Sequence, residues 1–170
     1  MNTGQSLLSL GALFLLSLTV LRVNNNILST ESVMQDSKFG VLATSLATSI
    51  IEKASNKAFD ANTDGNPVSS LTQLTSVTGL GPASNEHPPD DCDDFDDFNG
   101  YHTTISNLPS AIYDVSCEVC YVNPTNPNGK SSIPTWHKKM TVKVTSKNMG
   151  NDEQRDTIKL STIYSYWYFR

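Results

Sequence analysis

Cysteine and basic residues are scarce in this sequence, and both shortages exclude whole classes of protein. Three cysteines among 170 residues are too few for a fold that depends on several disulfides. Twelve Lys and Arg against 17 Asp and Glu give a net charge of −5, and the basic residues are scattered. Nucleic acid is therefore not an expected partner, because phosphate binding needs a clustered basic face. With 38% hydrophobic and 17% charged residues, the composition is that of a folded chain.

Motifs that carry catalysis are also missing. The sequence contains no phosphate-binding glycine loop, no H-E-x-x-H and no recognisable nucleophile–base pattern. We therefore expect a protein without enzymatic activity. A hydrolase that uses paired carboxylates of residues 90–97 is the enzymatic alternative, although no cleft-forming framework surrounds them in sequence.

Charge is absent from the first 21 residues, and residues 7–21 read LLSLGALFLLSLTVL. About 20 apolar residues in a helix cross the hydrocarbon core of a bilayer. A secretory signal would carry a basic segment and a small-residue cleavage site, and neither is present. We expect residues 1–22 to be a retained transmembrane helix half. A removed signal peptide and a buried core helix are the alternatives.

Residues 23–58 carry an amphipathic pattern beyond this apolar run. Apolar side chains recur at helical spacing and form one stripe: Ile27, Met34, Val41 or Leu42, Leu46, Ile50, Ala54 and Ala58. This pattern predicts that the helix continues as an amphipathic second half. The Asn run at 24–26 could instead break it into two helices, since Asn is a poor helix former.

Two acidic segments are candidates for binding calcium, which prefers carboxylate and carbonyl oxygens. In residues 60–65, Asp60, Asn62 and Asp64 match the D-x-N-x-D-G opening of a calcium loop, but the twelfth position is Leu71 instead of Glu. The alternative is a polar turn that caps backbone groups.

The second candidate is the run at 90–97, which contains six Asp in eight positions. Its tentative calcium ligands are Asp93, Asp94, Asp96 and Asp97. Phe95, Phe98 and Tyr101 alternate with these carboxylates, so we expect one edge of the run to pack against the core. A solvated, hydrogen-bonded turn is the alternative to a cation site.

Alternating apolar and polar residues predict three strands at 111–122, 136–146 and 156–169, with turns at 123–129 and 148–152. Residues 59–170 are thus predicted to form a globular head of loops and a small antiparallel sheet of three to four strands. The sheet must bury its apolar face, and the amphipathic helix half is the available partner. The predicted fold class is α+β, with a long N-terminal helix packed on this sheet.

The three cysteines could form a disulfide or contribute to a zinc site. A disulfide between Cys92 and either Cys117 or Cys120 is expected if the head lies outside the cytoplasm. A zinc site at Cys117 and Cys120 is disfavoured, because residues three apart on a strand point to opposite faces.

The order of these elements resembles the type IV pilin and pseudopilin superfamily. The run DDFDDFNGY at 93–101 resembles a segment of MSHA-type minor pilins, and residues 139–145 and 156–162 are similar to the last two strands of those proteins. The resemblance implies a structural subunit of a bacterial type IV pilus-like filament or type II secretion-like pseudopilus. Such a subunit assembles through its apolar helix with copies of itself or with other pilin-like subunits.

The resemblance also implies a cleavage site and a location. Gly4 would precede the leader cleavage and Gln5 would become the N-terminus, although the leader has no basic residue and Ser9 stands where the family has Glu. The implied location is the bacterial cell envelope, as a single-pass inner-membrane protein with an extracytoplasmic head or as a cell-surface filament. The alternative function is a membrane-anchored extracytoplasmic binding domain with a calcium-stabilised acidic loop.

Overall fold

The computed structural model describes residues 3–108, 111–151 and 154–167, and the chain divides into two compact units, Met1–Lys38 and Phe39–Arg170. The first unit is helical throughout its described part. Helix α1 spans Thr3–Ser55 and enters the second unit, so it runs without interruption through the Asn run at 24–26. Within the apolar part, the hydroxyl groups of Ser9 and Thr19 donate to the carbonyl oxygens four residues earlier, which satisfies these polar groups inside the helix.

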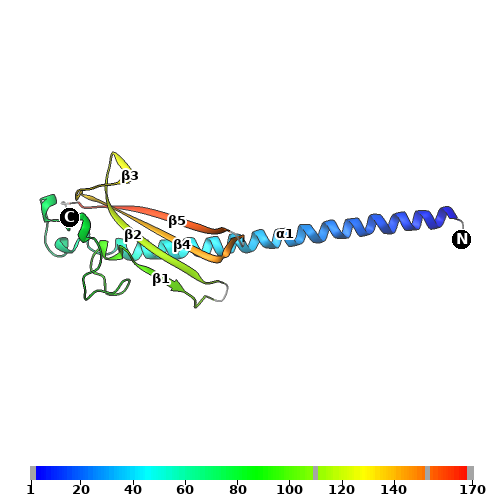
Figure 1. Cartoon of the computed structure of the whole chain (residues 1–170), viewed down its shortest axis with the longest axis horizontal. Helices are drawn as coiled ribbons and strands as arrows, with labels where there is room; N and C mark the ends of the chain where they lie inside the picture. Colours follow the sequence, from blue (N-terminus) through cyan, green and yellow to red (C-terminus); the bar gives the residue numbers. More distant parts are fainter. Residues whose placement is uncertain (1–2, 109–110, 152–153, 168–170) are drawn as a thin grey trace. The chain divides into compact units, whose positions relative to one another are not determined.

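The second unit combines the end of α1 with a five-stranded antiparallel sheet (Figure 1). Its strands are β1 (His102–Ile105), β2 (Tyr113–Asn123), β3 (Asn126–Lys130), β4 (His137–Asn151) and β5 (Gln154–Ser165). The order in the sheet is β1-β2-β4-β5, and β3 pairs with β2. The predicted α+β class and the helix-on-sheet packing are confirmed.

The three predicted strands correspond to β2, β4 and β5, whereas β1 and β3 were not predicted. Strand β3 begins at Asn126, inside the segment predicted to be a turn. Strand β4 extends to Asn151, so most of the turn predicted at 148–152 is strand, and residue 152 lies outside the described residues. The predicted end of the last strand, at residues 168–169, also lies outside them.

The core lies between α1 and one face of the sheet. Helix α1 contributes a stripe of small and branched residues, Ala43, Ala47, Ile50 and Ala54, at intervals of four, three and four. The sheet contributes the inward side chains of β2 and β4, which are Tyr113, Val115, Cys117, Val119, Met140, Val142 and Val144. In Figure 1 the second half of α1 lies behind β2, β4 and β5, in agreement with these contacts.

Residues 59–100 join α1 to β1 through four short 3-10 helices. These are η1 (Ala61–Thr63), η2 (Leu71–Gln73), η3 (Val77–Gly79) and η4 (Asp96–Phe98). Gly100 follows η4 with φ of 79°, a left-handed conformation that glycine adopts without strain, and it turns the chain into β1. The side chain of Asn99 links this segment to the sheet, because its Oδ1 accepts the N–H of Val119.

Candidate functional site: an apolar helix and a buried lysine–aspartate cluster

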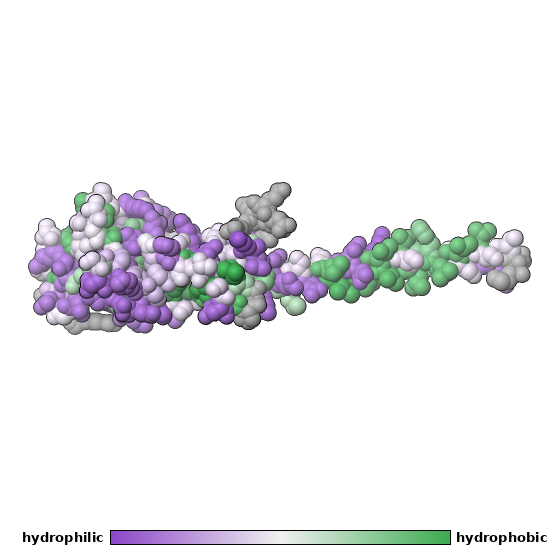
Figure 2. Space-filling view, turned by 60° about the horizontal axis from the view of Figure 1, so that its bottom comes forward, coloured by the Kyte–Doolittle hydropathy of each residue, from purple (hydrophilic) through white to green (hydrophobic). Residues whose placement is uncertain are grey.

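The first part of α1 presents large apolar side chains to the surroundings. Leu7, Leu13 and Phe14 are 71%, 61% and 65% exposed. The helix contains an 18-residue window with a mean hydropathy of 2.0, none of which is buried. By length and composition this one helix, near the N-terminus, is sufficient to cross a membrane. Its green surface in Figure 2 contrasts with the mostly purple and white visible surface of the head. Such a surface can pack against lipid or against other apolar helices.

Gly4 and Gln5, the residues on either side of the predicted leader cleavage, lie in the first turns of α1 and are exposed. Cleavage between them stays a prediction.

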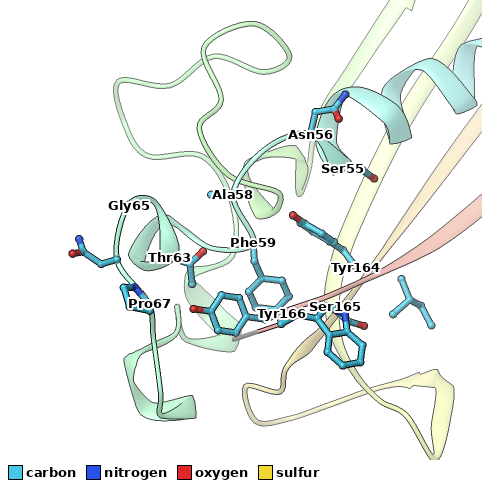
Figure 3. Close-up of a pocket in the computed structure, with 13 residues that line it drawn as sticks. Ser55, Asn56, Ala58, Phe59, Thr63, Gly65, Pro67, Tyr164, Ser165 and Tyr166 are labelled. Carbon is cyan, nitrogen blue, oxygen red and sulfur yellow. The ribbon is translucent and has the colours of Figure 1, made fainter. Parts of the chain in front are cut away.

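A pocket of ≈ 1030 Å³ opens where residues 55–67 meet the end of β5 (Figure 3). The aromatic rings of Phe59, Tyr164, Tyr166 and Trp167 line it together with uncharged polar side chains. Phe59 lies 5.8 Å from Tyr164 and 5.5 Å from Tyr166 between ring centroids. Among the described residues, those that line the pocket carry no ionisable group other than the tyrosine hydroxyls.

Asp60, the first predicted calcium ligand, is fully buried and turned towards the protein interior. Its Oδ1 accepts the N–H of Asn62 at 3.1 Å and the hydroxyl of Thr75 at 3.0 Å, and its Oδ2 accepts from Lys138 at 2.8 Å. Hydrogen-bond donors therefore occupy the oxygens that a cation would need. Asn62 donates its side-chain amide to Asp60, and Asp64 is exposed at the end of η1. These residues form a capping turn, the alternative to a calcium loop, and calcium binding by Asp60, Asn62 and Asp64 stays a prediction.

Lys138, in β4, is the centre of a buried ionic cluster and is fully buried. Its Nζ donates to the carbonyl oxygen of Phe59 at 2.7 Å and to Asp60 at 2.8 Å, and it forms an ion pair with Asp96. The ammonium group also lies 4.6 Å from the ring centroid of Phe59 and 5.3 Å from that of Tyr121. All three of its protons thus have partners, which is the condition for burying a charge.

The cluster connects three segments that are distant in sequence. Asp60 follows the end of α1, Asp96 lies in η4, and Lys138 lies in β4. Tyr121 of β2 adds a fourth contact, because its hydroxyl donates to the carbonyl oxygen of Thr75 at 2.8 Å and lies 3.2 Å from Asp60 Oδ2. The cluster therefore fastens the acidic run and the end of α1 to the sheet.

Asp94 and Asp97 hold the turn around η4 by accepting backbone N–H groups. Asp94 Oδ1 accepts from Asp96 at 2.7 Å and from Asp97 at 3.2 Å, and Asp97 Oδ2 accepts from Asp93 at 3.0 Å and from Asp94 at 3.1 Å. Such bonds satisfy N–H groups that the short helix leaves free. Both side chains are buried, and the neighbouring Phe95 and Phe98 enter the core. The expectation that one edge of the run packs inward agrees with these positions.

Burial and mutual repulsion perturb the titration of these carboxyl groups. Burial, with the negative charge of Asp96 beside it, raises the pKa of Asp94 to about 7. Burial raises the pKa of Asp97 to about 6, with the charges of Asp94 and Glu86 adding to the shift. Burial alone would raise the pKa of Asp60, but the hydrogen bond and charge of Lys138 hold it below its usual value.

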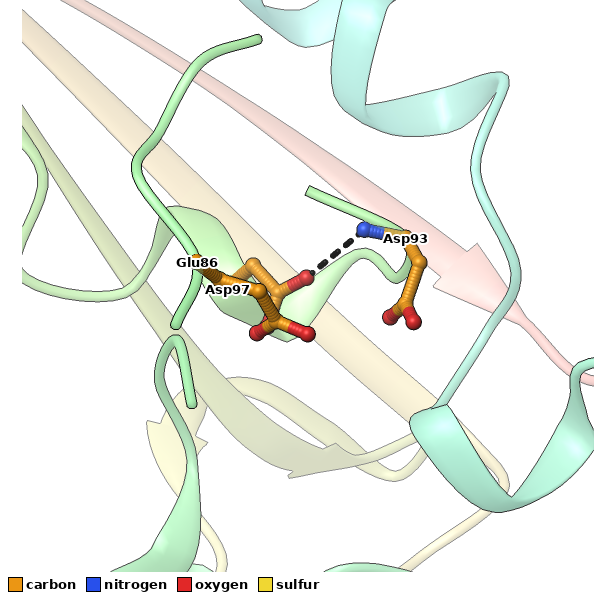
Figure 4. A group of neighbouring side chains, drawn as sticks. All are labelled: Glu86, Asp93 and Asp97. Carbon is orange, nitrogen blue, oxygen red and sulfur yellow. Dashed lines mark hydrogen bonds between the residues drawn. The ribbon is translucent and has the colours of Figure 1, made fainter. Parts of the chain in front are cut away.

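One group of carboxylates in the described part of the chain has the spacing of metal ligands. Glu86, Asp93 and Asp97 place one ligand oxygen each within 4.8 Å of the others (Figure 4). Two of the predicted ligands of the acidic run therefore lie together with Glu86, which was not predicted. Asp96 is instead paired with Lys138, and Asp94 accepts backbone N–H groups, as Oδ2 of Asp97 also does. These three oxygens could hold a hard cation such as calcium.

The three cysteines are free thiols in this structure, so the predicted disulfide from Cys92 to Cys117 or Cys120 is not formed. Cys92 and Cys117 are buried, and burial raises the pKa of each to about 12. Cys120 is half-buried, three residues beyond Cys117 on β2 and therefore on the other face. This geometry does not form a zinc site.

Lys138, like Glu86, is a site residue that the sequence analysis missed. It has the same strand parity as Met140, Val142 and Val144, all of which point into the core. A lysine at an inward position of a strand requires a buried carboxylate partner, and this signal was present in the alternation of β4.

Comparison with known proteins adds no family assignment. No protein-family model, no curated protein and no solved structure matches the chain.

Proposed function

We propose that the protein is a non-enzymatic structural subunit of a bacterial type IV pilus-like filament or type II secretion-like pseudopilus, which assembles through its apolar N-terminal helix. The observation that carries this proposal is the fully exposed apolar surface of the first part of α1. Large contiguous apolar surfaces mark contacts with membrane or with other proteins. The proposed subunit would hold this surface in the membrane before assembly and against neighbouring helices afterwards.

The construction of the head supports a structural role. The amphipathic end of α1 is built into the core, and the Lys138 cluster joins the segment after it to β4 and η4. A head joined to its helix in this way would follow the position of that helix in an assembly.

The proposal is tested on the full chain in the envelope of cells that produce it. Shearing should release filaments that pellet on ultracentrifugation, contain this chain and are visible by electron microscopy. The intact mass of the chain in the pellet would also report cleavage between Gly4 and Gln5. A chain that is monomeric in detergent and absent from sheared material would overturn the proposal.

Leu13→Arg tests the part played by the apolar helix. A charge at the centre of a membrane helix costs roughly 2.5–3.5 kcal/mol, so we expect strong loss of membrane retention and of filaments. Val41→Arg is the matched control for membrane retention, because Val41 is 69% exposed on the same helix but lies outside the apolar run. Equal membrane retention of both variants would contradict an anchoring role for the run.

A second candidate function is a membrane-anchored extracytoplasmic binding domain with a calcium-stabilised acidic loop. The observation in its favour is the spacing of the Glu86, Asp93 and Asp97 oxygens. In this case the full chain should stay monomeric in detergent, and millimolar calcium should raise its melting temperature. Glu86→Gln should abolish that rise, and magnesium, which is smaller and holds its water more tightly, should reproduce little of it.

A further inference from the structure

The face of the sheet that does not contact α1 carries an excess of lysine. Inward and outward side chains alternate along each strand, and the outward positions are mostly exposed or half-buried. Four lysines occupy this face and its β3 extension, and together we call them the basic face: Lys130, Lys139, Lys143 and Lys159. Among the residues that the structure describes, Asp114 and Glu118 of β2 bring negative charge to the same face. The face is therefore positive on a chain whose net charge is −5.

Two of these lysines repel each other at close range. Lys143 and Lys159 are direct partners in the register of β4 and β5, and like charges in this position destabilise a sheet. Among the described residues, no carboxylate lies within ion-pair distance of either lysine. Glu118 is committed to Lys130, and that hydrogen bond, with the charges of Lys143 and Lys159 nearby, lowers the pKa of Glu118. The basic face thus retains positive charge that the head itself does not neutralise.

The opposite side of the head carries exposed negative charge. Asp90, Asp91 and Asp93 are exposed and Glu86 is half-buried, and we call these four residues the acidic segment. An ion pair between Asp90 and Lys53 of α1, at 3.8 Å, places this segment beside the helix, on the covered side of the sheet. The backbone bridge between Ala58 and Asp94 supports the same placement.

Composition separates the two charges along the chain as well. No Lys or Arg occurs between Lys57 and Lys130, a stretch that includes the whole acidic segment. A single head therefore presents the acidic segment on its helix side and the basic face on the far side of its sheet.

We propose that the basic face of one subunit docks against the acidic segment of a second copy of this chain. This inference rests on the proposed function and names the contact between heads. Complementary surfaces on opposite sides of one molecule make a heterologous contact, which repeats without closing and produces a filament. Charge complementarity sets the register of such a contact and suppresses wrong pairings.

A second copy is the occupant that the charges favour. The chain supplies both halves of the contact, and each half carries like charges that the other would neutralise. A nucleic acid or another polyanion would match the basic face alone, and its approach would be opposed by the net charge of the chain. A calcium ion would match the acidic segment alone.

The test uses charge reversal in the full chain. Lys143→Glu with Lys159→Glu, and separately Asp90→Lys with Asp91→Lys, should each lower the yield of sheared filaments on the order of tenfold at low salt, because attraction becomes repulsion. Combining all four substitutions should restore the yield. Asp36→Lys with Asp64→Lys is the control for net charge, since both residues are exposed and lie outside the acidic segment. High salt should weaken wild-type assembly, because it screens exposed charges.

Cross-linking supplies a direct readout. A carbodiimide joins lysine to carboxylate in contact, and filaments made from mixed isotopically labelled and unlabelled chains should show links between basic face and acidic segment of different chains. Two results would overturn the inference and leave the proposal of helix-driven assembly standing. One is filaments without such links, and the other is normal assembly of a variant in which the charge of one surface alone is reversed. Absence of wild-type filaments would overturn both. Assembly that needs calcium and ignores salt would assign the acidic segment to a cation instead.

Discussion

Lys138 offers the most direct test of the buried cluster. Lys138→Met removes the charge and keeps a long apolar side chain of similar reach. Asp60 and Asp96 would then remain in the interior, 0% and 2% exposed, without the cation that they share. The carbonyl oxygen of Phe59 would also lose the donor that lies 2.7 Å away.

The expected loss follows from these contacts. Removing one partner of a buried ion pair costs about 3–5 kcal/mol, because it leaves a buried charge uncompensated. For a head of this size, each kcal/mol lowers the melting temperature by about 3–5 °C, so a decrease of roughly 10–20 °C is expected. Adding Asp60→Asn and Asp96→Asn to Lys138→Met should recover more than half of the decrease, because the neutral amides no longer bury an unpaired charge.

Thermal unfolding of the full chain in detergent, followed by near-ultraviolet circular dichroism, measures this effect. The aromatic signal reports the head, where all the tyrosine and tryptophan residues lie, whereas the far-ultraviolet signal includes the whole of α1. Lys139→Met is the matched control: the neighbouring lysine points to the outer face, and its loss should cost within about 0.5 kcal/mol. A Lys138→Met variant that melts within about 3 °C of this control would refute the cluster as a source of stability.

Two further predictions concern titration and thiol chemistry. Because burial raises the pKa of Asp94 to about 7 and that of Asp97 to about 6, from an ordinary 3.8, their contribution to stability is fully present below about pH 4 and is lost as the pH rises through 6 and 7. Stability, followed as the melting temperature, should therefore fall between about pH 4 and pH 7, by at most about 4 kcal/mol for Asp94 at 1.36 kcal/mol per pKa unit. Asp94→Asn should flatten the profile, and a rise instead would contradict the assignment. In the native chain a maleimide should modify the half-buried Cys120 quickly and the buried Cys92 and Cys117 only after unfolding. An intact mass that shows a disulfide would refute this pattern.

Local periodicity predicted most of the fold. The uncharged run, the absence of proline before residue 67 and the apolar stripe at 46, 50 and 54 predict the helix that the structure shows at Thr3–Ser55. Alternation predicted β2, β4 and β5. Strand β1 is only four residues long, and β3 has the turn-like sequence NPNGK, so pairing with β2 defines both.

The site was harder to predict than the fold. The acidic runs indicated a cation site, but in the structure Asp60 and Asp96 both bind Lys138, which lies 78 and 42 residues away in sequence. Among the described residues, Asp93 and Asp97 have the spacing of a metal site together with Glu86, which lies outside the run. The inward position of Lys138 in β4 indicates that its charge needs a buried partner, but it does not indicate which carboxylate that partner is.

The sequence by itself determined the helix, the buried faces of the main strands and the exposed apolar surface, because each follows from the spacing of side chains along one short segment. Tertiary structure alone decided which aspartates are buried with Lys138, which cap η4 and which remain on the surface. All these side chains carry the same carboxyl group, so their roles depend on the neighbours that the folded chain brings within a few ångströms and on the water that it removes.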